Sequence, residues 1–164
     1  MDNYMKLEIA AIGQNESFAR SAVAAFALCL NPSLTELSDI RTAVSEAVTN
    51  CIVHAYATKS EENKIMIECK TTETENGGTL HITITDGGKG IEDMEKAVLP
   101  FYTTLENEER SGMGFTIMQA FMDGFSLDSA KGKGTTVSMF RHVGEGNRIE
   151  KGVQGSAVKE SVNA

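Results

Sequence analysis

The chain has 164 residues, of which 41% are hydrophobic and 23% are charged, and this composition supports one packed domain, alone or with a tail. The net charge of −8 argues against a nucleic-acid binder, which needs a basic surface, but not against a nucleotide pocket, which uses backbone N–H groups and a metal ion. The three cysteines show no CxxC spacing, which argues against a disulfide framework or a zinc site. The sequence has neither a signal-peptide pattern nor an apolar run of about 20 residues, so we expect a soluble cytoplasmic protein.

The first stretch of the chain predicts a strand and a helix. Residues 6–12 alternate as a strand does, and Asn15 or Ser17 can cap a helix that reaches about residue 30. The apolar residues at helical spacing in this helix are Phe18, Ala22, Ala25, Phe26 and Cys29. Arg20 is its only basic residue, and two interpretations stay open: a solubilising charge on an outward face, or a contact for a protein partner.

A second, longer helix is predicted from a capping box, S-x-x-E at residues 33–36, to about residue 56. Glu46, Asn50 and His54 recur at every fourth position and therefore stack on one face, beside the apolar stripe rather than opposite it. A solvated helix face more often carries Lys and Glu pairs, so this arrangement suits a general base and a metal ligand. The competing interpretations are a surface carboxylate for Glu46 and a buried amide for Asn50, and we expect His54 to pack at the helix end.

The second half of the chain predicts paired strands, two helices and two irregular segments. In chain order these elements are strands at 64–70 and 79–85, helices at 92–98 and 115–122, and strands at 125–130 and 135–141. The Asn-Gly-Gly sequence at 76–78 joins the first two strands as a hairpin. Residues 100–114 are polar, acidic and long for a connector, which indicates a functional lid. Residues 144–164 show no apolar periodicity, so we predict a flexible tail behind a domain of residues 1–143.

Four short motifs carry the predicted chemistry. They are Glu46…Asn50 on the long helix, Asp86-x-Gly88-x-Gly90 after a strand, Gly112-Met113-Gly114 at a helix start, and Gly134-Thr135 at a strand start. Each motif is weak alone, and their order and structural context give them weight.

The two glycine motifs suit the two ends of a nucleotide. An ionised Asp86 only accepts hydrogen bonds, as an exocyclic amine such as adenine N6 requires, although an Asp at this place can simply initiate a turn. Gly88 and Gly90 let the backbone approach a flat ring or a ribose. Gly112 and Gly114 precede a helix whose free N–H groups and dipole favour a phosphate, unless they form an ordinary helix entry.

The remaining candidates would act on the same ligand. Ser111 adds a hydroxyl beside the phosphate site, and Thr135 can hydrogen-bond the base or serve only as a β-branched strand residue. Asn50 offers a neutral oxygen to Mg²⁺, which uses few protein ligands. Glu46 would then lie near the terminal phosphate and could accept the proton of an attacking hydroxyl or water.

Taken together, the motifs resemble the ATP-binding superfamily of gyrase, the heat-shock chaperone, histidine kinases and MutL-type proteins. This resemblance implies an α/β fold, namely an α+β two-layer sandwich. In it a mixed, mostly antiparallel sheet is covered on one face by helices, with a mobile lid over ATP.

Within that superfamily, the chain resembles the anti-sigma-F factors of spore-forming bacteria over about residues 4–143. The segments that carry the resemblance are NESFAR (15–20), SEAVTNCIVHAY (45–56), TT (103–104), ERSGMGFTIM (109–118) and KGTTV (133–137). The resemblance implies a serine protein kinase that uses Mg-ATP to phosphorylate a small anti-anti-sigma protein. It also implies a homodimer that sequesters a sporulation sigma factor.

The resemblance also implies a role for individual residues. Glu46 would be the general base, Asn50 the Mg²⁺ ligand and Asp86 the adenine contact, while Arg20 would lie on the partner-facing surface. The other residues implied to line the nucleotide are Gly88, Gly90, Thr104, Ser111, Gly112, Met113, Gly114, Phe115 and Thr135.

The predicted lid departs from the pattern of its relatives, which usually carry a Lys after the Thr pair. Leu105 stands there in this chain, and Arg110 is the alternative positive charge for the γ-phosphate. Two other functions stay open: a related anti-sigma kinase of a stress-response sigma factor, and a nucleotide-gated sigma-binding module without kinase activity. No direct contact with nucleic acid or membrane is expected.

Overall fold

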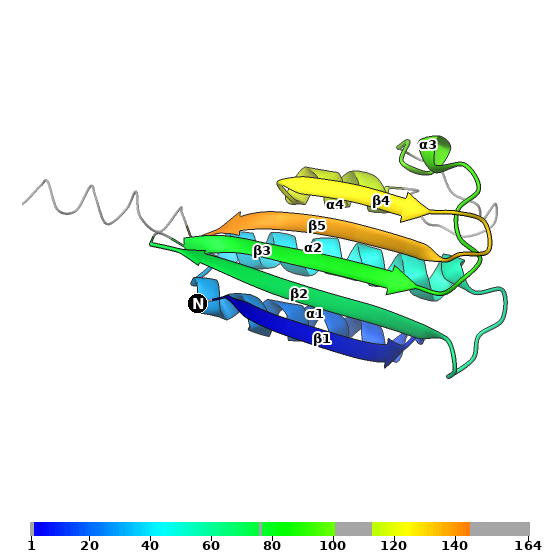
Figure 1. Cartoon of the computed structure of the whole chain (residues 1–164), viewed down its shortest axis with the longest axis horizontal. Helices are drawn as coiled ribbons and strands as arrows, with labels where there is room; N and C mark the ends of the chain where they lie inside the picture. The colour runs from blue at the N-terminus through cyan, green and yellow to red at the C-terminus, as the bar shows by residue number, and fades with distance from the viewer. Residues whose placement is uncertain (1, 76, 101–112, 145–164) are drawn as a thin grey trace, which may run out of the picture.

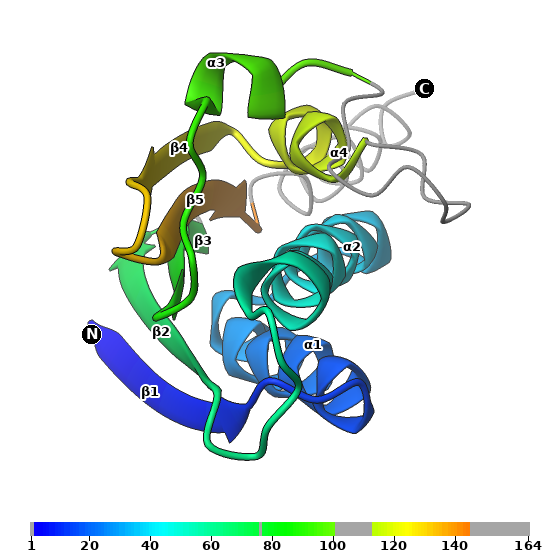
Figure 2. The same ribbon diagram turned by 90° about the vertical axis from the view of Figure 1, so that its right-hand side faces the viewer.

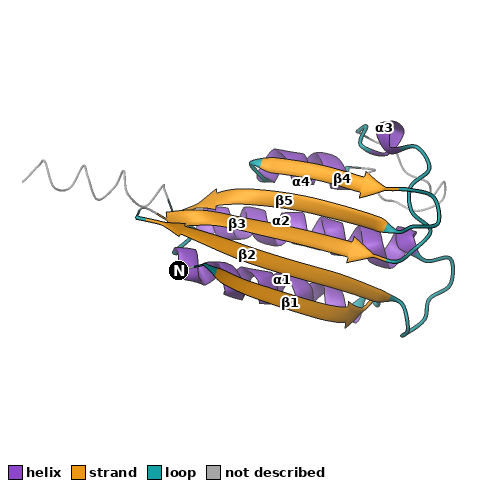
Figure 3. Ribbon diagram, viewed as in Figure 1, coloured by secondary structure: helices purple, strands orange, loops and turns teal. Residues whose placement is uncertain are grey.

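The computed structural model describes residues 2–75, 77–100 and 113–144. In chain order its elements are β1 (Asn3–Ala10), α1 (Gln14–Ala27), η1 (Leu28–Leu30), α2 (Leu34–Asn50), η2 (Cys51–Ala55), β2 (Lys64–Thr74), β3 (Gly77–Asp86), α3 (Met94–Ala97), α4 (Gly114–Phe121), β4 (Gly124–Ser129) and β5 (Thr135–Val143). They form two layers, with one sheet and the helices α1, α2 and α4 on a single face of it (Figures 1 and 2). Figure 3 separates the two layers by colour.

The sheet has five strands in the order β1-β2-β3-β5-β4, and each neighbouring pair is antiparallel. The predicted sandwich is therefore confirmed, although the described sheet is wholly antiparallel where a mixed, mostly antiparallel one was expected. Because β5 lies between β3 and β4, the end of β3 meets the start of β5 and the end of β4. Asp86 pairs with Thr135, and Thr135 pairs with Ser129.

The core lies between the sheet and the helices, as the alternation in the strands predicts. Alternate residues of β2 and β3 face the helices because successive side chains of a strand point to opposite faces. At most 1% of each of these side chains is exposed: Ile65, Ile67, Cys69, Leu80, Ile82 and Ile84. From α2 the core receives Ile40, Ala43, Val44, Ala47 and Val48. This buried face holds α2 over the sheet and presents the C-terminal end of α2 to the end of β3 and the start of β5.

The buried face of α1 differs from the apolar stripe that its spacing suggested. Its buried residues are Ala19, Val23, Ala24 and Ala27, whereas Phe18 is 53% exposed and Cys29 is exposed. Small residues on this face let α1 approach its neighbours closely. The predicted cap is also wrong: the helix begins after Gly13 without a side-chain cap bond, and Asn15 donates to the carbonyl of Ala10 instead.

The long helix begins as predicted and ends differently. In the confirmed capping box, Glu36 N–H donates to Ser33 Oγ at 3.2 Å and Ser33 N–H donates to Glu36 Oε2 at 2.6 Å. The α-helix stops at Asn50, and the next turn, η2, is a π-helix rather than a continuation to residue 56. Such wide turns are rare and are frequently found at functional sites.

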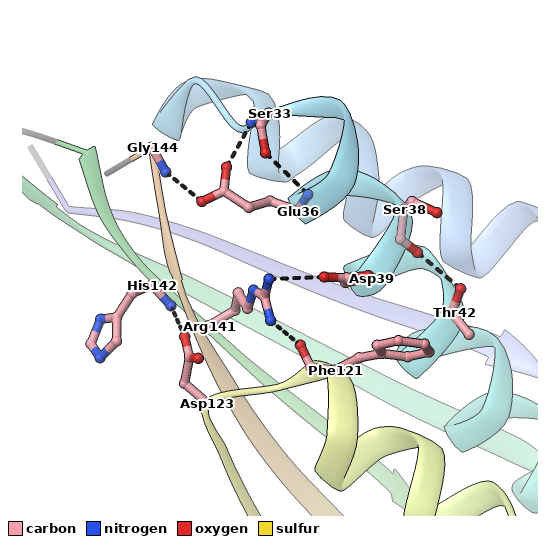
Figure 4. A network of polar contacts seen from close by, with 10 residues as sticks. All are labelled: Ser33, Glu36, Ser38, Asp39, Thr42, Phe121, Asp123, Arg141, His142 and Gly144. Atoms are coloured by element: carbon pink, nitrogen blue, oxygen red, sulfur yellow. Dashed lines mark hydrogen bonds and ion pairs between the residues drawn. The ribbon is translucent and has the colours of Figure 1, made fainter. Parts of the chain in front are cut away.

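The end of β5 is joined to the start of α2 by a hydrogen bond (Figure 4). Val143 is fully buried, and Gly144 N–H donates to Glu36 Oε1 at 3.1 Å. Gly144 was predicted to begin a flexible tail, but this bond and its burial place it in the folded domain. The rest of the predicted tail, residues 145–164, and most of the predicted lid, residues 101–112, lie outside the described residues. In the described part of the chain, no helix has both the length and the apolar character needed to cross a membrane.

Candidate active site

The first cluster of the candidate site forms where α2 meets the start of α4. Glu46 and Asn50 lie one turn apart on α2, and both are half-buried. A Cβ atom at Gly114 would lie 3.1 Å from Asn50 Nδ2 and 3.2 Å from Glu46 Oε2, so the first residue of α4 lies directly against both side chains. The first N–H groups of a helix have no partner within it and carry the positive end of its dipole. A carboxylate, an amide and an anion-binding helix end therefore meet at one point.

The second cluster surrounds Asp86 at the end of β3. Asp86 is 4% exposed, and its carboxylate accepts hydrogen bonds from Gly88 N–H at 2.9 Å, from the Cys51 thiol and from Thr135 N–H. Burial raises the pKa of Asp86, and these three donors oppose that rise. Burial and the neighbouring charge of Asp86 raise the pKa of Cys51 well above its usual value, so the thiol stays protonated and donates. Cys51 directly follows Asn50, so the two clusters share one end of α2.

The loop after Asp86 is fixed by the π-helical turn. Gly87 N–H donates to the Tyr56 hydroxyl at 3.1 Å, and Lys89 N–H donates to the Ala55 carbonyl at 2.7 Å. A Cβ atom at Gly88 would lie 2.2 Å from the Ala55 carbonyl oxygen. Gly88 therefore permits a close contact within the protein itself, in addition to the ligand approach that the sequence suggested.

The turn between β4 and β5 closes the same loop from its other side. Ile91 N–H donates to Ser129 Oγ at 2.8 Å, and Gly132 N–H donates to the carbonyl of Lys89. A Cβ atom at Gly90, whose φ is +71°, would lie 2.0 Å from the Ala130 carbonyl oxygen. The predicted motif at 86–90 thus packs directly against the turn between β4 and β5, which leads into the predicted motif at 134–135.

The structure brings together most of the predicted residues that it describes. Glu46, Asn50 and Gly114 form the first cluster, while Asp86, Gly88, Gly90 and Thr135 form or adjoin the second. Met113 is the N-cap residue of α4, and Phe115 packs on Phe125 with ring centroids 5.9 Å apart, so Phe115 has a packing role in this structure. Thr104, Ser111 and Gly112, together with Leu105 and Arg110 of the predicted lid, lie outside the described residues.

Arg20 lies on α1 and forms an ion pair within the protein. Its Nε atom lies 3.5 Å from Glu16 Oε1, a pair four residues apart on the helix. The same oxygen accepts the Ser45 hydroxyl of α2 at 2.6 Å. Arg20 is thus one end of a polar chain that reaches the residue next to Glu46, rather than an isolated outward charge. Its predicted contact with a partner stays a prediction.

Three residues of the site were missed in the sequence: Cys51, Tyr56 and Ser129. Cys51 falls on the apolar stripe of the helix, where a thiol passes as a small core residue. Tyr56 and Ser129 contact the loop at 86–91 only because distant segments meet there. The one local signal for Ser129 is a hydroxyl at a strand end just before a glycine-rich turn.

The residues of the first cluster fit a Mg²⁺ ion. The Asn50 carboxamide and the Glu46 carboxylate offer hard oxygen donors, and Mg²⁺ binds through one or two protein groups, several waters and the substrate phosphates. Among residues 2–75, 77–100 and 113–144, no group of three or more His, Cys, Asp or Glu side chains is arranged to hold a metal ion.

Comparison with known proteins decides the family. The profile of the histidine kinase-like ATPase domain matches residues 10–141. The chain is 53% identical over 144 residues to the anti-sigma F factor of Caldanaerobacter subterraneus subsp. tengcongensis, an alignment that covers 87% of this chain and 96% of that protein. The chain belongs to the anti-sigma F factor family. It is also 52% identical over 138 residues to the family member of Clostridium botulinum, with 84% of this chain and 93% of that protein covered.

A third family member, from Anoxybacillus flavithermus, is 48% identical over 143 residues and covers 87% of this chain and 94% of its own length. The family resemblance drawn from the sequence motifs is thereby confirmed. Among solved structures, the RsbU and RsbW domains of a Mycobacterium tuberculosis protein match with a TM-score of 0.59 and 16% identity, over 86% of this chain and 32% of that chain. At that identity the likeness concerns the fold alone.

Proposed function

We propose that the chain is an anti-sigma factor and an ATP-dependent protein serine kinase. It binds and inhibits a sporulation sigma factor, sigma F, and it uses Mg-ATP to phosphorylate a serine of an anti-anti-sigma partner. Membership of a family named for anti-sigma activity, together with the match to an ATPase domain, supports both parts of the proposal. The homodimer and the anti-anti-sigma substrate rest on the sequence resemblance.

The observation that carries the kinase proposal is the approach of α4 to α2. Gly114 brings the helix end that suits phosphate against Glu46 and Asn50, the pair that suits acid–base and metal chemistry. Phosphoryl transfer depends mainly on positioning and on electrostatic stabilisation, so such a meeting point is what the reaction requires.

Each residue then has a defined task. Asn50 would hold Mg²⁺ through its carboxamide oxygen, and the N–H groups at the start of α4 would bind the phosphates. When bound, ATP would supply the phosphoryl group, and the Mg²⁺ ion would neutralise negative charge on the phosphate oxygens. Glu46 accepts the proton of the attacking serine hydroxyl, and Asp86 together with Thr135 binds the adenine.

The substitution Glu46→Gln tests the general-base assignment. The amide keeps the size of the side chain but cannot take a proton, so phosphate transfer should fall by about 10²- to 10⁴-fold while nucleotide affinity stays within a few-fold of wild type. The measurement mixes the pure protein with Mg-ATP and a candidate anti-anti-sigma partner, and it locates phosphoserine by mass spectrometry. A calorimetric titration with ATP measures binding in the same samples.

Glu61→Gln is the matched control, because Glu61 is an exposed carboxylate in the turn before β2. It should transfer phosphate at the wild-type rate. Normal transfer by Glu46→Gln would contradict the assignment of the base. ATP-dependent capture of a sigma factor without transfer to any anti-anti-sigma partner would favour a binding module, and preference for a stress-response sigma factor would favour the related anti-sigma kinase.

A further inference from the structure

Three polar side chains lie in one row across the sheet at the end that adjoins the candidate site. Asp86 of β3 pairs with Thr135 of β5, and Thr135 pairs with Ser129 of β4. Directly paired residues of neighbouring strands project to the same face. The preceding row on the same face of the sheet is apolar, with Ile84, Val137 and Leu127 in register, and belongs to the helix-facing core. The polar row therefore ends the core at the place proposed for the base.

The hydrogen bonds of Ser129 fix where its own proton points. Ser129 Oγ accepts from Ile91 N–H at 2.8 Å and lies 2.8 Å from the Gly134 carbonyl oxygen, which can only accept. The single proton of Ser129 is therefore given to Gly134. A hydroxyl has one proton and two lone pairs, so one lone pair of Ser129 remains.

That remaining lone pair decides the state of Thr135. Thr135 Oγ1 lies 2.9 Å from Ser129 Oγ, and because the proton of Ser129 is already used, Thr135 must be the donor in this contact. The Thr135 proton then points at Ser129 and away from the base site, and only lone pairs of Thr135 Oγ1 remain. An ionised carboxylate has about four acceptor positions, and three donors occupy three of them at Asp86, so Asp86 likewise has a lone pair left to accept with and no proton to give.

We propose that Ser129 is a positioning residue for base selection: by holding the Thr135 proton, it makes the Asp86–Thr135 pair a purely accepting surface that binds 6-aminopurines and rejects 6-oxopurines. The inference rests on the proposed binding of ATP at this site. Adenine presents two N–H donors at position 6, whereas hypoxanthine presents an oxygen there. A carbonyl oxygen that faces only lone pairs loses its hydrogen bond on burial. A free Thr135 hydroxyl could turn and donate to that oxygen, and Ser129 prevents this turn.

Ser129→Ala tests the proposal with ATP and inosine triphosphate as probes. The two nucleotides share the ribose and the triphosphate, so their ratio of affinities isolates the purine ring. Calorimetric titrations with Mg²⁺ present should show that wild type prefers ATP, and that Ser129→Ala reduces this preference by about tenfold because its Thr135 hydroxyl is free to donate. Loss of the Ile91 and Gly134 contacts alone would weaken both nucleotides together and leave the ratio unchanged.

Two further variants keep the test independent of folding defects. Ser129→Thr retains the hydroxyl and should restore the wild-type ratio. Thr135→Val removes the accepting oxygen itself and should also lower the preference for ATP, through weaker ATP binding. Lys131→Ala is the control on the same turn, because it breaks only the exposed ion pair with Glu92 and should leave the ratio unchanged.

The outcomes separate this inference from the proposed function. A lowered ratio in Ser129→Ala that Ser129→Thr restores would support the inference. An unchanged ratio in Ser129→Ala, or a wild type that binds ATP and inosine triphosphate equally, would overturn the inference and leave ATP binding standing. A wild type that binds neither nucleotide would overturn both.

Discussion

Asp86 is a carboxylate that folding places in a nearly dry position. It is 4% exposed, and the groups that stabilise its negative charge in the described part of the chain are three hydrogen-bond donors, namely Gly88 N–H, Thr135 N–H and the Cys51 thiol. Burial of a carboxylate that no opposite charge neutralises is costly, and carboxylates whose pKa is perturbed in this way are typical of functional sites. Its raised pKa follows from the burial and makes its accepting ability sensitive to pH.

ATP affinity should depend on the protonation of Asp86. In the proposed site the ionised carboxylate accepts the adenine amine, whereas the protonated group loses this role, so affinity should rise as pH rises through the raised pKa and level off above it. By linkage, ATP binding should lower the pKa of Asp86 and release protons. Calorimetry at a series of pH values from about 4 upward, where an ordinary aspartate titrates, measures both effects.

Asp86→Asn should weaken ATP binding at neutral pH and remove most of this pH dependence. The control is Asp128→Asn, which changes an exposed aspartate on β4 and should keep the wild-type profile. A steep profile that persists in Asp86→Asn would assign the titration to another group.

At the scale of elements, the site depends on how closely α4 approaches α2. A Cβ atom on Gly114 would lie 3.1 to 3.3 Å from the side chains of Glu46 and Asn50, which is closer than most Cβ contacts. The π-helical turn at Cys51–Ala55 then carries the chain away from α2 and binds the loop after Asp86. Two junctions between elements, one at each cluster of the candidate site, therefore hold the two clusters.

Gly114→Ala should impair nucleotide binding with little loss of stability. The added methyl group displaces Glu46 and Asn50, and we expect Mg-ATP affinity to fall by about tenfold or more. Alanine is a better helix former than glycine, so the thermal midpoint should stay near wild type. Calorimetry and thermal denaturation measure the two effects separately.

Gly13→Ala is the matched control for this substitution. Gly13 precedes α1 with an ordinary helical φ of −56°, and a Cβ atom there would meet nothing within 4 Å. It should leave ATP binding unchanged. Equal losses in the two variants would show that the effect does not come from contact with Glu46 and Asn50.

At the scale of the whole molecule, one ion pair joins elements that are far apart in the sequence. Arg141 of β5 donates to Asp39 of α2 at 2.8 Å and to the carbonyl of Phe121 at the end of α4 (Figure 4). Both charged side chains are only 18% exposed. The pair thus links α2, α4 and β5 at the opposite ends of α2 and α4 from those that form the site.

Arg141→Met should lower the free energy of unfolding by about 2 kcal/mol. The substitution removes the hydrogen-bond donor of both Asp39 and the Phe121 carbonyl, which are largely buried. Urea denaturation of Arg141→Met, Asp39→Asn and the double variant measures the coupling. The losses should not add, since the two residues act as a pair.

Lys6→Met is the control, because Lys6 forms an exposed ion pair with Glu68 across β1 and β2. It should cost less than about 1 kcal/mol. A loss in Arg141→Met no larger than that in Lys6→Met would contradict a structural role for the buried pair.

Much of the fold was predictable because it depends on local patterns. Alternation in β2 and β3 marks their buried faces, the capping box marks the start of α2, and the order of the short motifs marks Glu46, Asn50, Asp86 and Gly114. These features are properties of consecutive or regularly spaced residues, so the sequence by itself determines them.

Only the tertiary structure decided which residues meet. Phe18 is apolar but exposed, whereas Ala19 is buried, because the close approach of α1 to its neighbours favours a small side chain there. Ser129 and Arg141 gain their roles from strand register and from helix packing, which link residues far apart in the chain. The sequence therefore determined the chemical groups and their elements, and the packing of β5 between β3 and β4 decided how those groups are oriented and held.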